Sequence, residues 1–301
     1  MRKILLAVHE ARQEALEVAV RLAFDLRSAG LAVGVLDTEH EALVATGIGD
    51  VEVVSHAEGA ADGFELAVVL GGDGTILRAS EVCRGTETPV LGVNLGHVGF
   101  LAEADVEDLQ DVVDCVVGRT YTVEERLTVD VCVVVDGEVV ATNWALNEAS
   151  VEKAARERML EVVVEIDDRP VSRWGCDGLV CATPTGSTAY NFSAGGPIVW
   201  PEVQALLLVP ISAHALFARP LVVSPSSVLA VEVVGERSSG VLWCDGRRAA
   251  ELPVGARVEV RRSEVPARLA RLHAAPFADR LVRKFDLPVA GWRGAAEERR
   301  G

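Results

Sequence analysis

The first 120 residues alternate between short apolar runs and longer amphipathic stretches. In the stretch 10–29, Leu16, Ala23 and Leu26 share one helical face, and Gly30 fits the position after the helix end. The same reasoning predicts strands at 4–8, 31–36, 51–54, 66–70 and 89–93, and further helices at 76–84 and 106–117. Strands that alternate with helices are typical of a parallel sheet covered on both faces. We therefore expect a doubly wound α/β domain over residues 1–120.

From about residue 120 the apolar positions recur at every second residue. Val129, Val131 and Val133 follow this period, and Asp136-Gly137 then favours a tight hairpin turn into 138–145. Further β-like runs lie at 160–166, 179–182, 221–223, 228–234, 241–244 and 257–261. These runs predict a β-rich second domain over residues 121–272. Residues 277–285 return to helical spacing.

Composition and charge exclude several classes of protein. Half of the 301 residues are apolar, which allows two domains with sizeable cores. No apolar run reaches the roughly 18 residues that cross a membrane, and residues 1–8 are too short for a signal peptide, so we expect a cytoplasmic protein. The net charge of −16 disfavours nucleic acid and anionic membranes as partners and leaves small molecules.

The six cysteines are scattered and form no C-x-x-C pair. A zinc site or a disulfide framework is therefore not expected. The sequence instead predicts buried, reduced thiols.

The strand at 66–70 is followed by Gly71-Gly72-Asp73-Gly74-Thr75. Glycines permit positive φ and let a ligand approach the backbone, and the N-terminus of the next helix suits phosphate. A carboxylate beside phosphate repels it unless the carboxylate binds Mg²⁺ or accepts a proton from an attacking hydroxyl. The turn thus indicates phosphoryl transfer, although a bare Gly-Asp turn can equally be a plain strand-to-helix connection.

Three other polar groups follow strand-like runs. Asn147-Glu148 and Asp177-Gly178 could bind a ribose or a base edge, and each could also be an ordinary turn. The run 183–190, Thr-Pro-Thr-Gly-Ser-Thr-Ala-Tyr, carries more hydroxyls than helix capping requires. That run favours a hydrogen-bonding cradle for a polar ligand.

Taken together, these motifs resemble those of the NAD kinases, which phosphorylate the 2′-hydroxyl of the adenosine ribose of NAD to give NADP. The likeness is carried by 71–75, 94–96 with 99–101, 147–148, 177–178, 183–190 and 193–197. The resemblance implies a bacterial, actinobacterial protein and a final segment, 273–301, that returns to the first domain. It also implies a homodimer or homotetramer in which a neighbouring subunit completes each site.

The resemblance further implies site residues. Asp73 and Gly74 would contact the NAD ribose and phosphates, and Arg78 would supply positive charge. Asn147 and Glu148 would hold the adenine-side ribose and amino group, near Arg158 and Asp177. The adenine pocket and one further ligand contact would come from Thr188, Ala189, Tyr190, Ser193 and Arg247. His97 stands where relatives often carry Arg.

For the chemistry, Asp73 could accept the proton of the 2′-hydroxyl, or it could serve only as a ligand of Mg²⁺ or ribose. Mg²⁺ would arrive with the phosphoryl donor, ATP or polyphosphate, because few carboxylates are available and no metal site of the protein itself is expected. Two alternatives stay open: a lipid kinase of the diacylglycerol or sphingosine type, which shares the Gly-Gly-Asp-Gly-Thr turn, and a non-catalytic dinucleotide-sensing protein.

Overall fold

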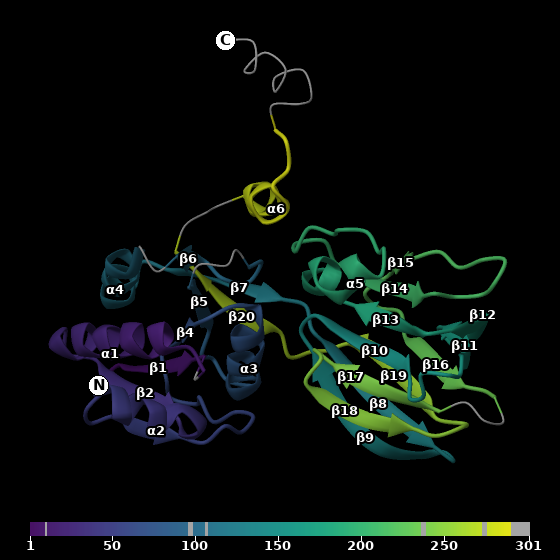
Figure 1. Ribbon diagram of the computed structural model, residues 1–301, viewed down its shortest axis with the longest axis horizontal. Helices are drawn as coiled ribbons and strands as arrows, with labels where there is room; N and C mark the ends of the chain where they lie inside the picture. The colour runs from purple at the N-terminus through teal and green to yellow at the C-terminus, as the bar shows by residue number, and fades with distance from the viewer. Residues whose placement is uncertain (10, 96–98, 106–107, 236–238, 273–275, 290–301) are drawn as a thin grey trace, which may run out of the picture. The chain divides into compact units, whose positions relative to one another are not determined.

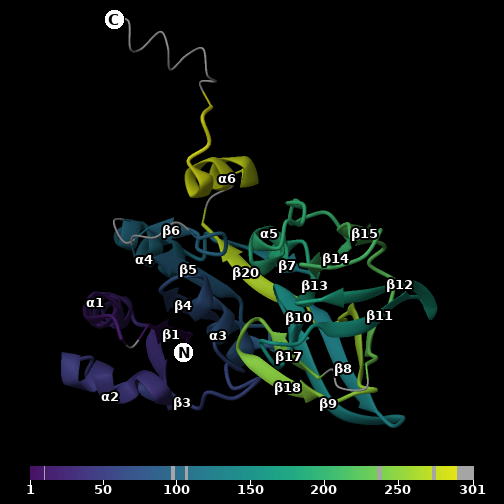
Figure 2. The ribbon, with the colours of Figure 1, turned by 45° about the vertical axis from the view of Figure 1, so that its right-hand side comes forward.

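A computed structural model describes residues 1–9, 11–95, 99–105, 108–235, 239–272 and 276–289 (Figure 1). The chain divides into two compact units. The first comprises Met1–Glu125 and Arg268–Gly301, and the second comprises Arg126–Ala267. The first unit is an α/β structure and the second is built mainly of strands (Figure 2).

The first unit is organised around a mainly parallel sheet. Its described strands are β1 (Lys3–Val8), β2 (Ala32–Leu36), β3 (Glu52–Val54), β4 (Leu66–Leu70), β5 (Val90–Asn94), β6 (Ala104–Asp105), β7 (Thr122–Arg126) and β20 (Ala267–Arg271). They lie in the order β3-β2-β1-β4-β5-β20-β7, with β6 also paired to β5. The pairs from β3 through β20 are parallel. The chain order reverses between β1 and β4, and ligands of open α/β sheets bind at the carboxyl ends of strands at such a point.

Helices cover both faces of this sheet. They are α1 (Gln13–Ser28), α2 (Asp37–Thr46), α3 (Asp73–Cys83) and α4 (Leu109–Gly118), whereas the last helix, α6 (Phe277–Phe285), buries no side chain. Side chains of α1, α2 and α4 join one core cluster with Ile4, Leu6 and Val8 of β1. The helix α3 packs on the opposite face, where a Cβ on Gly92 would lie 2.4 Å from Ile76 Cδ1. The predicted doubly wound α/β fold is confirmed, whereas α2 was not predicted.

Aromatic and ionic contacts join the C-terminal helix to other segments of the first unit. The rings of Phe277 and Phe285 lie 5.9 and 5.8 Å from that of Phe100. Arg280 donates to Glu103 Oε2 at 2.5 Å and to the carbonyl of Phe100 at 3.3 Å. Arg271 shares the same buried carboxylate at 2.6 Å. The predicted helix at 277–285 is confirmed.

The described part of the second unit contains two antiparallel sheets. The first has the order β15-β14-β13-β10-β17-β18, and the second has the order β12-β11-β16-β19-β8-β9. The strands are β8 (Val129–Val135), β9 (Glu138–Ala145), β10 (Glu148–Lys153), β11 (Leu160–Ile166), β12 (Arg169–Cys176), β13 (Gly178–Ala182), β14 (Leu206–Ile211), β15 (Leu221–Val223), β16 (Leu229–Val233), β17 (Gly240–Cys244), β18 (Arg248–Leu252) and β19 (Arg257–Arg262). Alternate residues of both sheets, such as Val131 and Val151, form one core cluster. The predicted β-rich architecture is confirmed.

Two of the predicted turns have different structural roles. Asp136 and Gly137 both have positive φ, 51° and 81°, and close the expected β8–β9 hairpin. Asp177, in contrast, lies between β12 and β13, which belong to different sheets. Leu146 and Asn147 likewise connect β9 to β10, again from one sheet to the other. The chain therefore changes sheets at both of these candidate ligand segments.

Two predictions from composition can be compared with the fold. The thiols of Cys83, Cys176, Cys181 and Cys244 are buried, as expected, and burial raises the pKa of Cys83 and Cys181 to about 12. Cys115 and Cys132 are only partly buried. None of the helices in the described ranges combines the length and the apolar character that crossing a bilayer requires.

A single carboxylate, that of Glu65, links the start of β1, the start of β4 and the connection from α4 to β7. Glu65 accepts hydrogen bonds from Arg2 at 2.6 and 2.7 Å, from Arg119 at 2.6 Å and from the Tyr121 hydroxyl at 3.2 Å. Arg2 also donates to the carbonyls of Val116 and Val117 at the end of α4. The hydrogen bonds from Arg2, followed by those from Arg119, lower the pKa of Glu65 to about 2.

We predict that Glu65→Gln lowers the free energy of unfolding by about 1–3 kcal/mol at pH 7. Because the pKa in the folded state is depressed from 4.5, this contribution is present above about pH 4.5 and is lost as the pH falls toward 2. Urea unfolding of both proteins at several pH values between 7 and 3 measures the difference. The control is Glu52→Gln, which breaks an exposed pair with Lys3 and should cost less than about 0.5 kcal/mol. A Glu65→Gln deficit that is equal at pH 7 and pH 3 would contradict this assignment.

Candidate functional site

Asp73 is the first residue of α3 and follows the fully buried strand β4. Its carboxylate accepts the N–H of Phe100 at 3.2 Å and the N–H of Leu101 at 3.1 Å. A Cβ on Gly99 would lie 2.4 Å from Asp73 Oδ1, so only glycine lets this segment approach the carboxylate so closely. The side chain is only partly buried, and it therefore presents a fixed carboxylate at the carboxyl edge of the sheet.

The glycines of the turn do not use the positive φ that glycine permits. Gly71, Gly72 and Gly74 all lie outside the left-handed region. A Cβ on Gly71 would meet Thr75 Oγ1 at 2.5 Å, whereas Cβ atoms on Gly72 and Gly74 would have no neighbour within 4 Å. Gly71 is thus required by packing. Gly72 and Gly74 instead leave the backbone at the N-terminus of α3 open to a ligand.

Arg78 lies farther along α3 and forms an ion pair that the sequence did not indicate. Its guanidinium donates to the fully buried carboxylate of Glu39 and to the carbonyl of Val8 at 2.5 Å. The other oxygen of Glu39 accepts the Val8 N–H at 2.7 Å. Arg78 is therefore anchored at the end of β1, and much of its charge is compensated by Glu39.

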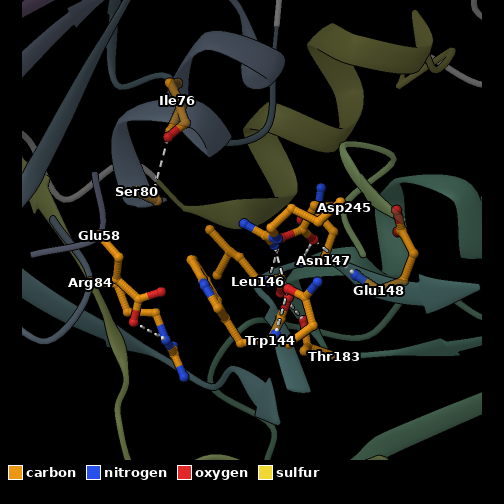
Figure 3. A network of polar contacts seen from close by, with 12 residues as sticks. Glu58, Ile76, Ser80, Arg84, Trp144, Leu146, Asn147, Glu148, Thr183 and Asp245 are labelled. Carbon is orange, nitrogen blue, oxygen red and sulfur yellow. Dashed lines mark hydrogen bonds and ion pairs between the residues drawn. The ribbon is translucent and has the colours of Figure 1, made fainter. Parts of the chain in front are cut away.

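Asn147 and Glu148 lie where the chain passes from β9 to β10 in the second unit, and both are buried. Three successive N–H groups, from Leu146 to Glu148, point to the Asp245 carboxylate (Figure 3). Arg248 donates to the same carboxylate at 2.9 Å. Asp245 and Arg248 were missed because their local signal is only an Asp-Gly turn after a strand.

The Glu148 carboxyl group is strongly perturbed. Burial, followed by the nearby charge of Asp245, raises its pKa to about 8, opposed by a hydrogen bond from the Tyr190 N–H. Its Oε2 atom is buried and has no hydrogen-bond partner within the described residues. Such a group is a neutral acid at pH 7, able to donate a hydrogen bond to a ligand.

The 183–190 run packs against this segment. Thr183 donates its N–H to the Asn147 carbonyl at 2.9 Å and its hydroxyl to the Leu146 carbonyl at 2.6 Å. A Cβ on Gly186 would lie 2.0 Å from the Asn147 oxygen, which explains the glycine. Thr188 and Ala189 precede Tyr190, and all three are partly exposed. The structure thus brings Asn147, Glu148 and the 188–190 segment together.

Asp177 lies close enough to Tyr190 for its charge to affect the Tyr190 hydroxyl. Lys153 donates to its carboxylate at 2.5 Å, and this bond holds the pKa of Asp177 below its usual value. Burial raises the pKa of Tyr190, and the charges of Glu152, Glu148 and Asp177 add to that effect. Tyr190 therefore faces an acidic environment.

The other site residues that the sequence predicted are exposed or lie outside the residues that the structure describes. Arg158 is exposed in the β10–β11 connection, Arg247 is exposed on the β17–β18 turn, and Ser193 is exposed at the end of a short helix, α5 (Tyr190–Ser193). Gly96 and His97 lie outside the described residues.

The side chains near Asp73 are compatible with a divalent cation that arrives bound to phosphate. Among the described residues, no group of three or more His, Cys, Asp or Glu side chains is arranged to hold a metal ion. Asp73 offers carboxylate oxygens at the N-terminus of α3, so a bound cation would take most of its ligands from phosphate and water.

Two family models and several known proteins match this chain. The ATP-NAD kinase N-terminal domain matches residues 4–121, and the ATP-NAD kinase C-terminal domain matches residues 146–272. The NAD kinase of Thermobifida fusca is 61% identical over 304 residues, covering 99% of this chain and 93% of the relative. NAD kinase 2 of Streptomyces coelicolor is 62% identical over 296 residues, covering 98% of each chain. Both organisms are actinobacteria, as the resemblance suggested.

Two solved structures share the fold. Yeast NADH kinase complexed with NADH aligns with a TM-score of 0.84 at 24% identity, covering 97% of this chain and 88% of that one. An NAD kinase from Archaeoglobus fulgidus in complex with ATP aligns with a TM-score of 0.70 at 26% identity, covering 95% and 98%. Two family models along most of the sequence, and relatives at 61% and 62% identity, show that the chain belongs to the NAD kinase family.

Proposed function

We propose that this chain transfers the terminal phosphoryl group of ATP to the 2′-hydroxyl of the adenosine ribose of NAD, with Asp73 as the general base. Membership of the NAD kinase family supports the reaction. The observation that carries the role of Asp73 is its carboxylate, fixed by the N–H groups of Phe100 and Leu101 at the switch point of the sheet. The Archaeoglobus relative in complex with ATP supports ATP as the donor.

Asp73 is suited to hold a proton during the reaction. A ribose hydroxyl is a poor nucleophile, and phosphoryl transfer depends mainly on in-line positioning and charge neutralisation. A carboxylate fixed by two N–H groups keeps its orientation and can accept the 2′-hydroxyl proton as the new bond to phosphorus forms. Mg²⁺, when bound with the donor, would neutralise phosphate charge, with Asp73 as the available carboxylate.

The N-terminus of α3 would receive phosphate. Gly72 and Gly74 leave its backbone open, so unpaired N–H groups of the first turn can donate to phosphate oxygens without a P-loop lysine. Arg78 is anchored by Glu39 farther along the same helix, and we assign it a phosphate contact that is weakened by that pairing.

The second unit would bind the adenosine portion of NAD. Asn147 and Glu148 have buried side chains beside Tyr190, and Glu148 has an unsatisfied oxygen with which to meet a hydroxyl or amino group. Thr188, Ala189, Tyr190 and Ser193 would line the adenine pocket. Arg158, Asp177 and Arg247 would make the remaining contacts, in part with a neighbouring subunit of a homodimer or homotetramer. That assembly, and a cytoplasmic location, remain predictions.

The reaction is tested by incubating the purified chain with NAD, Mg²⁺ and either ATP or polyphosphate. We expect NADP to form with ATP, detected through an NADP-specific dehydrogenase that distinguishes a 2′-phosphate. Phosphorylation of diacylglycerol or sphingosine instead would favour a lipid kinase. Binding of NAD with no turnover would favour a dinucleotide-sensing protein. No NADP with either donor would contradict the proposal.

The raised pKa of Glu148 predicts a pH dependence of NAD binding. Below about pH 8 the group is neutral and can donate a hydrogen bond, whereas above that pH it ionises and repels anionic NAD. We expect the Kd for NAD, measured by calorimetry, to rise as the pH increases from 7 to 9. Glu148→Gln, which stays neutral, should bind NAD within about threefold of wild type at pH 7 and lose this dependence.

Glu161→Gln is the control, because Glu161 pairs with Arg173 on an exposed face of β11 and should leave the profile unchanged. A wild-type Kd that stays flat from pH 7 to 9, or a Glu148→Gln variant that keeps the wild-type slope, would show that Glu148 is not the titrating group.

A further inference from the structure

Asp245 holds the segment that carries Asn147 and Glu148, although it lies about a hundred residues farther along the chain. Its Oδ1 atom accepts the Asn147 N–H at 2.7 Å and the Glu148 N–H at 3.3 Å, and its Oδ2 atom accepts the Leu146 N–H at 2.9 Å (Figure 3). The Asp245 side chain is only 2% exposed, and its φ of 52° aims it back from the β17–β18 turn.

Arg248 makes this buried carboxylate tolerable. Its guanidinium donates to Asp245 Oδ2 at 2.9 Å and to the carbonyl of Trp144 at 2.8 Å. It also lies 4.6 Å from the centre of the Trp144 ring, within range of a cation–π contact. These contacts offset part of the cost of burying the charge, and burial still raises the pKa of Asp245 above its usual value.

Thr183 and the Asp245 backbone bind the carbonyl groups of the same segment. The Thr183 hydroxyl donates to the Leu146 carbonyl and the Thr183 N–H donates to the Asn147 carbonyl, while the Asp245 N–H donates to the Glu148 carbonyl at 2.9 Å. Every backbone N–H and carbonyl from Leu146 to Glu148 therefore has a partner, from Asp245 or Thr183. The backbone is saturated, and only the side chains of Asn147 and Glu148 remain to meet a ligand, with Glu148 Oε2 still unpaired in the described part of the chain.

We propose that Asp245 is a positioning residue for NAD: it fixes the backbone at 146–148 so that the Asn147 amide and the Glu148 carboxyl are presented in one geometry. Asp245 does not itself touch the substrate. The inference rests on the proposed function, since it requires that Asn147 and Glu148 bind NAD. The alternative is that Asp245 is an ordinary structural cap: the same hydrogen bonds would stabilise the fold and have no effect on the affinity for NAD.

The chain offers a matched control for that alternative. Asp167 also has a positive φ, 53°, and lies in the same unit. Its carboxylate accepts the Val228 N–H at 2.9 Å and the Ser227 hydroxyl at 3.0 Å. Asp167→Asn thus weakens a carboxylate cap of the same kind, although a more exposed one, on a segment that carries no proposed NAD contact.

The test compares Asp245→Asn with Asp167→Asn. Asparagine keeps one acceptor oxygen but turns an NH₂ group toward existing donors, so the 146–148 segment should loosen. We expect Asp245→Asn to raise the KM and Kd for NAD by about tenfold or more while kcat falls less than about threefold. Amide exchange in a peptide spanning 144–150 should speed up in the free protein. Asp167→Asn should lower the melting temperature without changing either quantity.

The outcomes separate the two proposals. Wild-type protein that binds no NAD would overturn the proposed function. Wild-type protein that binds NAD, with an Asp245→Asn affinity no weaker than that of Asp167→Asn, would overturn the positioning role alone. If Asp245→Asn does not fold, Arg248→Lys serves instead, because it keeps the charge but loses the planar guanidinium that lies over the Trp144 ring and whose Nη2 atom donates to both Asp245 and the Trp144 carbonyl. We then expect the Kd for NAD to rise about three- to tenfold, and an unchanged Kd would overturn the role.

Discussion

Backbone N–H groups hold the carboxylates on which both candidate sites depend. In the first unit, Phe100 and Leu101 fix Asp73; in the second, the segment 146–148 is fixed on Asp245. A carboxylate that accepts hydrogen bonds from two or more backbone N–H groups is held in a fixed orientation. That property suits a base that must take a proton beside phosphate. It also suits a buried carboxylate that holds a segment of backbone in place.

This mode of attachment constrains the residues around it. Main chain can approach a carboxylate or a carbonyl closely only where no side chain intervenes, as at Gly99 beside Asp73 and at Gly186 beside Asn147. The open glycines, Gly72 and Gly74, have a different role, since space around them is left for a ligand. The Gly-rich motifs therefore contain two kinds of glycine. At one kind a Cβ would clash with neighbouring atoms, and at the other a Cβ would occupy space that is left open for a ligand.

The sequence predicted the parts of the fold and the site that have local causes. Alternating strands and helices, the Asp136-Gly137 hairpin and the amphipathic helix at 277–285 all follow from short-range periodicity or turn chemistry. The helix α2 was missed because a charged residue, Glu39, occupies one of its buried positions. The strand β10 was missed because its first residues suggested a ligand loop.

The remaining errors concern partners that are distant along the chain. Nothing near Arg78 indicates that Glu39 compensates its charge, and nothing near Asn147 indicates Asp245. Such pairings depend on how sheets are ordered and where the chain changes from one to another, which local patterns do not specify.

Replacing Asp73 by Asn tests the central claim most directly, because the change keeps the size of the side chain and removes the basic oxygen. If Asp73 accepts the proton of the 2′-hydroxyl, kcat for NADP formation should fall by about 10²-fold or more, while the Kd for NAD, measured by calorimetry, stays within about threefold of wild type. A variant with near-normal kcat, or one that loses only its affinity for NAD, would contradict the account.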